Sequence, residues 1–433
     1  MLSSVCLKNF KSFREATMKL SPLTFLIGPN ASGKSNALEA LRFLSLLARG
    51  LRLDDIEREM AKNTLLRGTV SDLFYNCSEA FELSISLYDL AVLFPELISP
   101  LTIGIRLDKE HLSITREDIP FGANMLYEVK SSSGDFPNSV IVRYNNFAPG
   151  GNKPEIPCSN KQAIFYQLDT PGRFSTKAAK QIIPVVKAFR ETLQNIYFLD
   201  PRPAEMRGYS FIGDHQYLNE TGSNLSSILY AICQDERKKD LLDFVKALPE
   251  QDIVDINFIK TERNDVMVSL VESFGGKHRN VDAPLLSDGT LRVLAVAAAL
   301  LIAPSSATVI IEEIDNGIHP SRAKHMVEKL YEVGEQRNVQ ILVSSHNPAL
   351  LDAVPNEKLS EVLCCFRDPQ SGGSRILKLG DSDRFAELTA QGTLGQLMTM
   401  PILDQILKDQ STPEQRTAQA LSWIQDFARA VHE

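Results

Sequence analysis

The sequence has few cysteines, and their spacing does not suggest a disulfide or a metal site. The six are Cys6, Cys77, Cys158, Cys233, Cys364 and Cys365. They contain no CxxC pair, and the one close pair is adjacent in a segment that we expect to be a strand. The pattern excludes a disulfide framework and predicts buried, reduced thiols. The 433 residues, 43% of them hydrophobic, suffice for one elaborated domain or two to three smaller ones with their own cores.

Long apolar runs, an excess of basic charge and heptad repeats are also lacking. The longest apolar run, residues 293–303, is too short and too rich in alanine to span a bilayer, and we recognise no charged-then-apolar leader before the first strand. We therefore expect a cytoplasmic protein with no membrane partner. The formal net charge of −8 argues against general coating of nucleic acid, although a local basic groove is compatible with it. The missing heptads exclude a coiled-coil arm.

The first 80 residues predict a strand, a glycine-rich turn and a helix. Apolar runs at 4–7 and 23–27 favour strands, and apolar residues between 37 and 47 recur at helical spacing before Gly50. Short alternating segments at 81–87, 101–107 and 139–144, separated by Gly, Pro and Asn, predict an antiparallel β section over 81–175.

Helical patterns follow at 176–195, with a kink at Pro184, and at 224–248, capped by Asn224 and stopped by Pro249. They predict a helical lobe over 176–280, with strand texture at 255–271.

The C-terminal third predicts a second half of a parallel sheet. A buried helix at 291–302 and short apolar strands at 309–311 and 339–344, around a helix at 321–336, are typical of a sheet covered on both faces. We expect residues 1–80 and 281–380 to form one core, followed by a helical segment over 381–433. The tail positions Trp423, Ile424, Phe427 and Val431 have helical spacing.

Residues 28–35 read GPNASGKS and match the GxxxxGK[ST] pattern at every fixed position, between an expected strand and an expected helix. The glycines let backbone N–H groups turn inward around a phosphate, and the helix adds its dipole. Lys34 should reach the β- and γ-phosphates, and the Ser35 hydroxyl should ligate Mg²⁺. The alternative, a glycine-rich turn that matches the pattern by chance, is disfavoured by the expected strand before it and the expected helix after it. The predicted nucleotide-binding residues are Asn30, Ala31, Ser32, Gly33, Lys34 and Ser35.

The apolar strand at 308–311 ends in two acids, Glu312 and Glu313, at the sheet edge where the phosphate loop emerges. Glu312 would hold the magnesium shell through water, and Glu313 would orient or deprotonate an attacking water. Solvated acids at a strand end are the alternative. The strand at 339–345 runs into His346, which could touch a γ-phosphate at the same edge.

Residues 286–290 read LSDGT, and Ser287 suits a helix N-terminus that could bind an anion, although Ser-Asp-Gly is also an ordinary turn. In this order, residues 28–35, 286–290, 310–313 and 345–346 resemble the Walker A, signature, Walker B and switch-histidine elements of ABC-type ATPases. The strings LKNFKSF, LTFLIGPNASGKSN, LSDGT and IIEEIDNGIHP are similar to the RecF, SMC and OLD-like branch. The resemblance is close over about 1–50 and 285–355.

The resemblance implies an α/β P-loop ATPase head of the ABC type, with an inserted antiparallel β section and a helical signature lobe. It implies ATP and Mg²⁺ as ligands and a homodimer or higher homo-oligomer, in which Ser287 and Gly289 of one copy close over the nucleotide held by Lys34 of the other. A loop would meet its twin across the interface through Asp315, Asn316, Gly317 and His319. Glu312 stands where Asp is commoner, and no Q-loop glutamine can be assigned.

The resemblance also frames the function. OLD-like relatives often carry a TOPRIM nuclease, but Asp381-Ser382-Asp383 lacks the preceding Glu-Gly strand, so we expect no nuclease in this chain. Similar single-domain heads serve bacterial anti-phage systems, which favours an ATPase that senses a trigger and regulates a protein effector, a toxin or nuclease encoded nearby. One alternative is a DNA repair or chromosome-maintenance ATPase acting directly on DNA, and another is an ATP-bound scaffold with little turnover. A basic face for DNA would draw on Arg202, Arg207, Arg263, Lys277 and Arg279.

Overall fold

The computed structural model describes residues 1–62, 65–88, 100–130, 138–150, 152–170, 174–213, 216–246, 253–314, 320–400 and 402–409, with a few single positions between and beyond them. The loop around Asp315, which we expect to contact the same loop of a second copy, lies outside the described residues. The tail positions around Trp423 lie outside them as well. Among those described, no helix has the length and apolarity needed to cross a bilayer.

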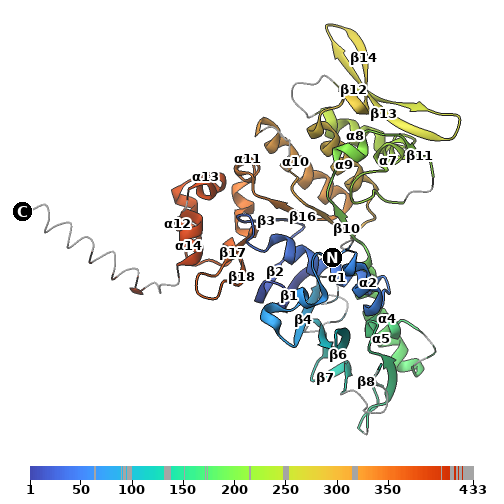
Figure 1. Cartoon of the computed structure of the whole chain (residues 1–433), viewed down its shortest axis with the longest axis vertical. Coiled ribbons are helices and arrows are strands. Elements are labelled where there is room, and N and C mark those ends of the chain that lie inside the picture. Colours follow the sequence, from blue (N-terminus) through green and yellow to red (C-terminus); the bar gives the residue numbers. More distant parts are fainter. Residues whose placement is uncertain are drawn as a thin grey trace, which may run out of the picture.

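Three sheets organise the chain: an antiparallel sheet of eight strands, a core sheet of six, and a small sheet of four above the core in Figure 1. The eight-stranded sheet, ordered β2-β1-β4-β5-β6-β7-β8-β9, consists of β1 (Leu2–Phe10), β2 (Phe13–Lys19), β4 (Ala80–Leu87), β5 (Leu101–Asp108), β6 (His111–Phe121), β7 (Asn124–Val129), β8 (Ser139–Tyr144) and β9 (Glu155–Ser159). The core sheet, ordered β10-β15-β16-β3-β17-β18, consists of β10 (Ile196–Leu199), β15 (Thr308–Ile311), β16 (Gln340–Ser345), β3 (Leu23–Ile27), β17 (Leu363–Arg367) and β18 (Ser374–Lys378). The small sheet consists of β11 (Ser210–Phe211), β12 (Ile253–Lys260), β13 (Asp265–Phe274) and β14 (Lys277–Asp282).

Helices cover these sheets. The α-helices are α1 (Lys34–Ala48), α2 (Leu53–Ala61), α4 (Ile164–Leu168), α5 (Thr176–Gln194), α6 (Pro203–Met206), α7 (Leu225–Ile232), α8 (Arg237–Lys246), α9 (Asp288–Ile302), α10 (Pro320–Arg337), α11 (Pro348–Asp352), α12 (Phe385–Gln391), α13 (Leu394–Thr399) and α14 (Ile402–Lys408). Short 3₁₀ turns lie at Val70–Leu73, Tyr75–Cys77, Ala283–Leu285, Asn356–Glu361 and Leu379–Asp381.

The core sheet explains why its strands read as unbroken apolar runs. Strands β10, β15, β16, β3 and β17 are parallel, and β3, β15 and β16 are buried along their whole length. Leu26, Ile310 and Leu342 face the core shared with α1 and the eight-stranded sheet. Phe25 and Val309 face the core shared with α9 and α10. A sheet buried on both faces has no polar alternation, so the expected α/β class with a parallel core is confirmed.

The segments between the phosphate loop and the C-terminal core strands do not follow the expected division into a β section at 81–175 and a helical lobe at 176–280. Strands β1 and β2 pair into the antiparallel section, because β1 lies between β2 and β4. Helix α5, with Pro184 inside it, packs with α1 and α4 in that same core, whereas α7 and α8 pack on the small sheet and α9. The expected helical lobe at 176–280 is therefore split, and its second part is half sheet.

The single helix expected at 224–248 is two helices, which corrects that prediction. The chain turns between α7 and α8, and Asp235 accepts the N–H of Arg237 at 2.9 Å and pairs with its guanidinium. Asn224 does not cap α7 with its side chain. Its carboxamide instead accepts the N–H of Asn219 and donates to the carbonyl of Tyr217, which fixes the preceding loop.

Candidate functional site

The phosphate loop (residues 28–35) connects β3 to α1 as a tight turn that only glycine fits at two positions. Gly28 has φ 148° and Gly33 has φ 116°, both outside the usual range of other residues. A Cβ on Gly28 would lie 2.1 Å from the carbonyl oxygen of Cys365, and one on Gly33 would lie 2.4 Å from Ser374 Oγ. The Lys34 ammonium donates to the carbonyls of Gly28, at 2.7 Å, and of Pro29, at 3.0 Å. The lysine side chain therefore lies along the loop.

Strands from both ends of the chain hold this loop in place. Arg367, at the end of β17, donates through Nε to the carbonyl of Ala31 at 2.9 Å. Ser374, at the start of β18, donates its N–H to the carbonyl of Ser12 in the β1–β2 turn at 2.7 Å. Asn36 donates to Ser12 Oγ at 2.8 Å from the first turn of α1. The loop is thus packed between the β1–β2 hairpin and the β17–β18 hairpin.

Parallel pairing brings the two acids to the same edge as the loop. Strand β15 ends beside β16, and β16 ends beside β3, so the chain leaves all three strands on one side. Glu312 donates its N–H to the Leu199 carbonyl of β10 at 2.9 Å. Glu313 has φ 48° and donates its N–H to Ser344 Oγ at 3.3 Å, so the chain turns sharply where its exposed carboxylate emerges.

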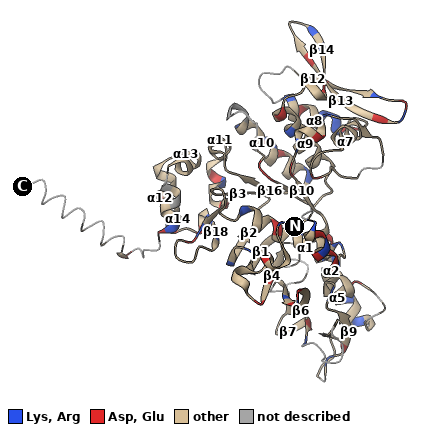
Figure 2. Ribbon diagram, viewed as in Figure 1, with Lys and Arg blue, Asp and Glu red and all other residues tan. Residues whose placement is uncertain are grey.

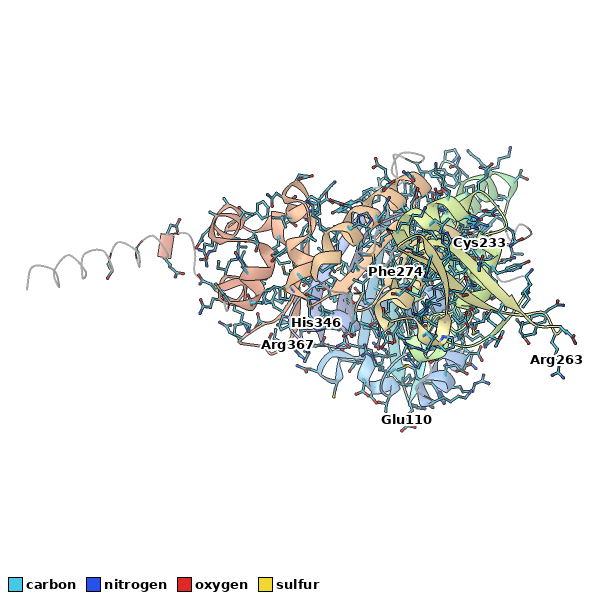
Figure 3. All side chains as sticks on the ribbon, turned by 90° about the horizontal axis from the view of Figure 1, so that it is seen from above. Glu110, Cys233, Arg263, Phe274, His346 and Arg367 are labelled. Carbon is cyan, nitrogen blue, oxygen red and sulfur yellow. The ribbon has the colours of Figure 1, made fainter. Side chains whose placement is uncertain are left out.

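One pocket of about 260 Å³ unites three of the four predicted elements. It is lined by residues 30–36, Arg67, Glu312, Glu313, Ser344, Ser345, His346 and Arg367. Figure 3 shows His346 and Arg367, which line this pocket, near each other. The predicted residues Asn30 to Ser35, both glutamates and His346 therefore share one cavity.

The electrostatics of the pocket centre on Glu312. Its burial raises the pKa of this carboxyl above the ordinary value, and the charges of Arg42 and Arg67 oppose the rise. Burial alone would lower the pKa of Arg67, but its hydrogen bond to Glu39 and the nearby carboxylates raise it. Glu39 is buried on α1 and also pairs with Lys11. A half-buried carboxylate near permanent cations is suited to neutralisation by a further cation such as Mg²⁺.

Two buried polar atoms at the pocket have no hydrogen-bond partner among the described residues. These are Ser32 Oγ and His346 Nδ1. Buried polar atoms in native proteins are nearly always paired, so these two atoms are available to a group that enters the pocket. Together with a glycine cradle shaped for phosphate, they fit a bound nucleotide.

The signature segment (residues 286–290) lies away from this pocket. Ser287 caps α9 by accepting the N–H of Thr290 at 3.1 Å, and its side chain is exposed, while Gly289 is buried. Arg207 fixes the segment by donating to the Leu286 carbonyl at 3.0 Å and to Asp288 at 2.7 Å. Neither Ser287 nor Gly289 lines the pocket of its own chain.

The five basic residues proposed for a DNA-binding face do not form one surface. Arg202 pairs with Asp200 and Glu205, and Arg207 pairs with Asp288. Arg263, Lys277 and Arg279 lie on the small sheet, in the β12–β13 turn and on β14. The charges of the first two are partly neutralised in place, and Arg263 lies at the opposite end of β13 from Lys277 and Arg279, so only Lys277 and Arg279 lie together.

Sequence reasoning missed Arg67 and Arg367, which also line the pocket. Arg67 belongs to a loop without a motif, and Arg367 is the last residue of a strand that only its two cysteines indicated. No local pattern marks either residue. Their place follows from the tertiary pairing of β17 with β3 and of Arg67 with Glu39.

A phosphate loop after one strand of a parallel sheet, two acids after a second and a histidine after a third define the nucleotide-binding half of an ABC-type P-loop ATPase. Comparison with known families agrees. Residues 1–133 match the family described as AAA ATPase domain, and residues 168–352 match "AAA domain, putative AbiEii toxin, Type IV TA system". The predicted resemblance to this class of P-loop ATPase is thereby confirmed.

Individual relatives are distant. The chain is 22% identical over 386 residues to an ATP/GTP phosphatase of Helicobacter pylori, covering 86% of this chain and 94% of that protein. It is 52% identical over 44 residues to the DNA replication and repair protein RecF of Chlamydia caviae, covering 10% of this chain and 12% of RecF. A crystal structure of an SMC head bound to the C-winged helix domain of ScpA matches 92% of this chain and 99% of its own, at 13% identity and a TM-score of 0.48. The RecF similarity is thus confined to a short segment, whereas the phosphatase is similar along nearly its whole length.

Proposed function

We propose that this protein binds and hydrolyses ATP, and that the pocket shared by the phosphate loop, Glu312, Glu313 and His346 is its catalytic site. Lys34 would bind the β- and γ-phosphates, and Ser35 and Glu312 would hold Mg²⁺, which would neutralise the phosphate charge. Glu313 takes a proton from the water whose oxygen attacks the γ-phosphorus. The bond between the γ-phosphorus and the bridging oxygen breaks, so that ADP leaves with this oxygen and inorganic phosphate is released. His346 orients the γ-phosphate.

The site is completed by a second copy of the chain. Ser287 is exposed at the N-terminus of the fifteen-residue helix α9 but does not reach its own pocket, which supports a contribution in trans. A helix N-terminus stabilises an anion, so Ser287 and Gly289 would close over the γ-phosphate of the partner copy. ATP binding then joins two copies, and hydrolysis releases them.

The cellular role that we propose is regulation of a separate protein effector, a toxin or nuclease, in anti-phage defence. One matching family is described as an AAA domain of a putative AbiEii toxin from a type IV toxin–antitoxin system, and this match supports the role. The alternative, an ATPase that acts directly on DNA, is supported by the short RecF similarity. A scaffold with little turnover is the third possibility.

Steady-state hydrolysis by Glu313→Gln and Lys34→Ala tests the site. Glu313→Gln should bind ATP but turn it over at least about a hundredfold more slowly, because a general base contributes at least that much, and should accumulate as a dimer. Lys34→Ala should lose nucleotide binding. Glu335→Gln, an exposed glutamate on α10, is the matched control and should hydrolyse ATP normally. A Glu313→Gln protein with the wild-type rate would refute the assignment of the base.

Mixing two inactive variants tests the composite site. Lys34→Ala removes the site of its own copy, and Ser287→Arg blocks the site of its partner. A mixed dimer contains one site with both residues intact, so it should trap ATP while neither variant does so alone. If no mixture traps ATP although the wild type does, Ser287 does not act in trans.

Two further measurements separate the cellular roles. An effector should co-purify with Glu313→Gln from the native host, whereas a direct DNA-acting enzyme should show ATPase stimulation by duplex DNA. Low turnover in both settings would favour the scaffold.

A further inference from the structure

The β13–β14 hairpin extends beyond the body of its lobe (Figure 1). Strand β13 is buried from Val266 to Glu272, but every residue from Phe274 to Asn280 is exposed. The strands pair Phe274 with Lys277 and Glu272 with Arg279 around the turn Gly275-Gly276. The end of this hairpin is therefore a two-stranded ribbon with both faces in solvent.

This ribbon carries an unbalanced positive charge in an acidic chain. Lys277, His278 and Arg279 follow one another, and none of them forms an ion pair within the described part of the chain. Of the nearest acids along the strands, Glu272 is only 8% exposed and Asp282 lies at the base of the hairpin. Figure 2 shows basic residues at the β14 end of this sheet. A basic tip on a protein of net charge −8 indicates an anionic partner.

The hairpin at the other end of β13 provides an internal comparison. Its turn holds Arg263, which Figure 3 shows at an outer tip, but Glu262 and Asp265 flank that residue. Lys260 is occupied, because its ammonium lies 4.3 Å from the centre of the Tyr230 ring and donates to the Tyr230 hydroxyl at 2.6 Å. The basic charge is thus concentrated at one end of the strand.

Apolar exposure occurs at the same tip. Phe274 is 52% exposed, and an added Cβ on Gly275 or Gly276 would meet nothing within 4 Å. An exposed aromatic ring beside two glycines and two free cations forms a narrow tip that a large, charged partner can approach closely.

We infer that this basic hairpin (residues 274–280) is a docking element for double-stranded DNA. A two-stranded β-ribbon fits the major groove of B-form DNA, whereas the major groove of an RNA duplex is too narrow. Lys277 and Arg279 contact phosphates on the groove walls, and Phe274 makes apolar contact inside the groove, where thymine methyl groups lie. Strand addition by an acidic peptide is disfavoured, because lysine on an exposed edge opposes pairing with another strand.

This inference goes beyond the proposed ATPase and does not depend on it. DNA binding by the hairpin is measured without nucleotide, and hydrolysis is measured without DNA. If DNA binding is absent and ATP hydrolysis is present, the proposal for the hairpin has failed. If ATP hydrolysis is absent and DNA binding is present, the proposal for the ATPase has failed.

The test is fluorescence anisotropy of a labelled duplex of about three helical turns, titrated with the full-length protein at several salt concentrations. Lys277→Ser/Arg279→Ser should bind at least tenfold more weakly at low salt. The slope of log K against log salt should fall in magnitude by about two, because two phosphate contacts are lost. Phe274→Ala should weaken binding with the slope unchanged.

Arg263→Ser is the matched control on the opposite hairpin and should leave the affinity within about twofold. All substituted side chains are exposed, so the melting temperature and the DNA-free ATPase rate should not change. Unchanged affinity and slope in the double variant would overturn the inference. So would equal competition by polyglutamate of matched charge, which would indicate an acidic protein as the partner.

Discussion

Replacement of Gly28 by alanine should damage the phosphate loop more than any other single methyl group added to it. The new Cβ would lie 2.1 Å from the backbone oxygen of Cys365, well inside the 3.0 Å limit that real Cβ atoms keep. The oxygen belongs to β17, which pairs with β3, so neither side can move freely. Backbone strain at φ 148° adds about 1–3 kcal/mol. Overpacking of a close-packed site adds about 1–3 kcal/mol more.

The expected total is a destabilisation of about 2–6 kcal/mol, concentrated where the loop must hold its shape. Binding of a fluorescent ATP analogue should therefore weaken at least tenfold, and thermal unfolding should begin at a lower temperature. Gly372→Ala is the matched control, because Gly372 also has a left-handed φ of 68° but nothing within 4 Å of an added Cβ. It should cost about 1–2 kcal/mol and leave nucleotide affinity unchanged. Equal behaviour of the two variants would refute the steric argument.

Two further predictions concern residues outside the pocket. Arg207→Gln removes the ion pair with Asp288 and weakens the hold on the Leu286 carbonyl; both groups are partly exposed, so the loss is about 1 kcal/mol. ATP-dependent dimerisation should weaken about fivefold by analytical ultracentrifugation while ATP binding to the monomer stays constant, and an unchanged dimer would contradict a positioning role. Burial raises the pKa of Glu117 to about 7, although hydrogen bonds from the Tyr127 hydroxyl and two backbone N–H groups act to lower this pKa. The folded state therefore holds an extra proton between pH 4.5 and about 7, and the free energy of unfolding should fall as pH rises through that window, by at most about 1.4 kcal/mol per unit. Denaturant titrations of Glu117→Gln should lack this slope, and an identical slope in both proteins would exclude Glu117 as its source.

Local patterns were sufficient for the elements that carry the site. The strand at 23–27, the loop and the helix that follows are predictable because a phosphate loop needs a fixed order of backbone conformations over a few residues. Strands β15 and β16 were recognisable as short apolar runs, since both faces of a parallel sheet are buried.

Pairing between distant segments was not predictable from those patterns. Strand β14 reads as a polar segment, because its first four residues are exposed on both faces. The four-residue strand β10 begins directly after the helix predicted over 176–195, and no pattern in so short a segment indicated a strand. Arg67 joins the pocket through Glu39 on α1, a contact that no spacing reveals.

The packing of β17 and β18 against the phosphate loop sets a lower limit on the length of a working fragment. A protein truncated just after His346 would keep each recognisable sequence motif of the site. It would lose the Cys365 backbone that packs on Gly28, the Arg367 bond to Ala31 and the Ser374 bond to Ser12. The loop would then be open to solvent on one side, with its shape no longer fixed by neighbours. The motifs thus mark where the chemistry lies, and a stretch of chain without motifs determines whether it can take place.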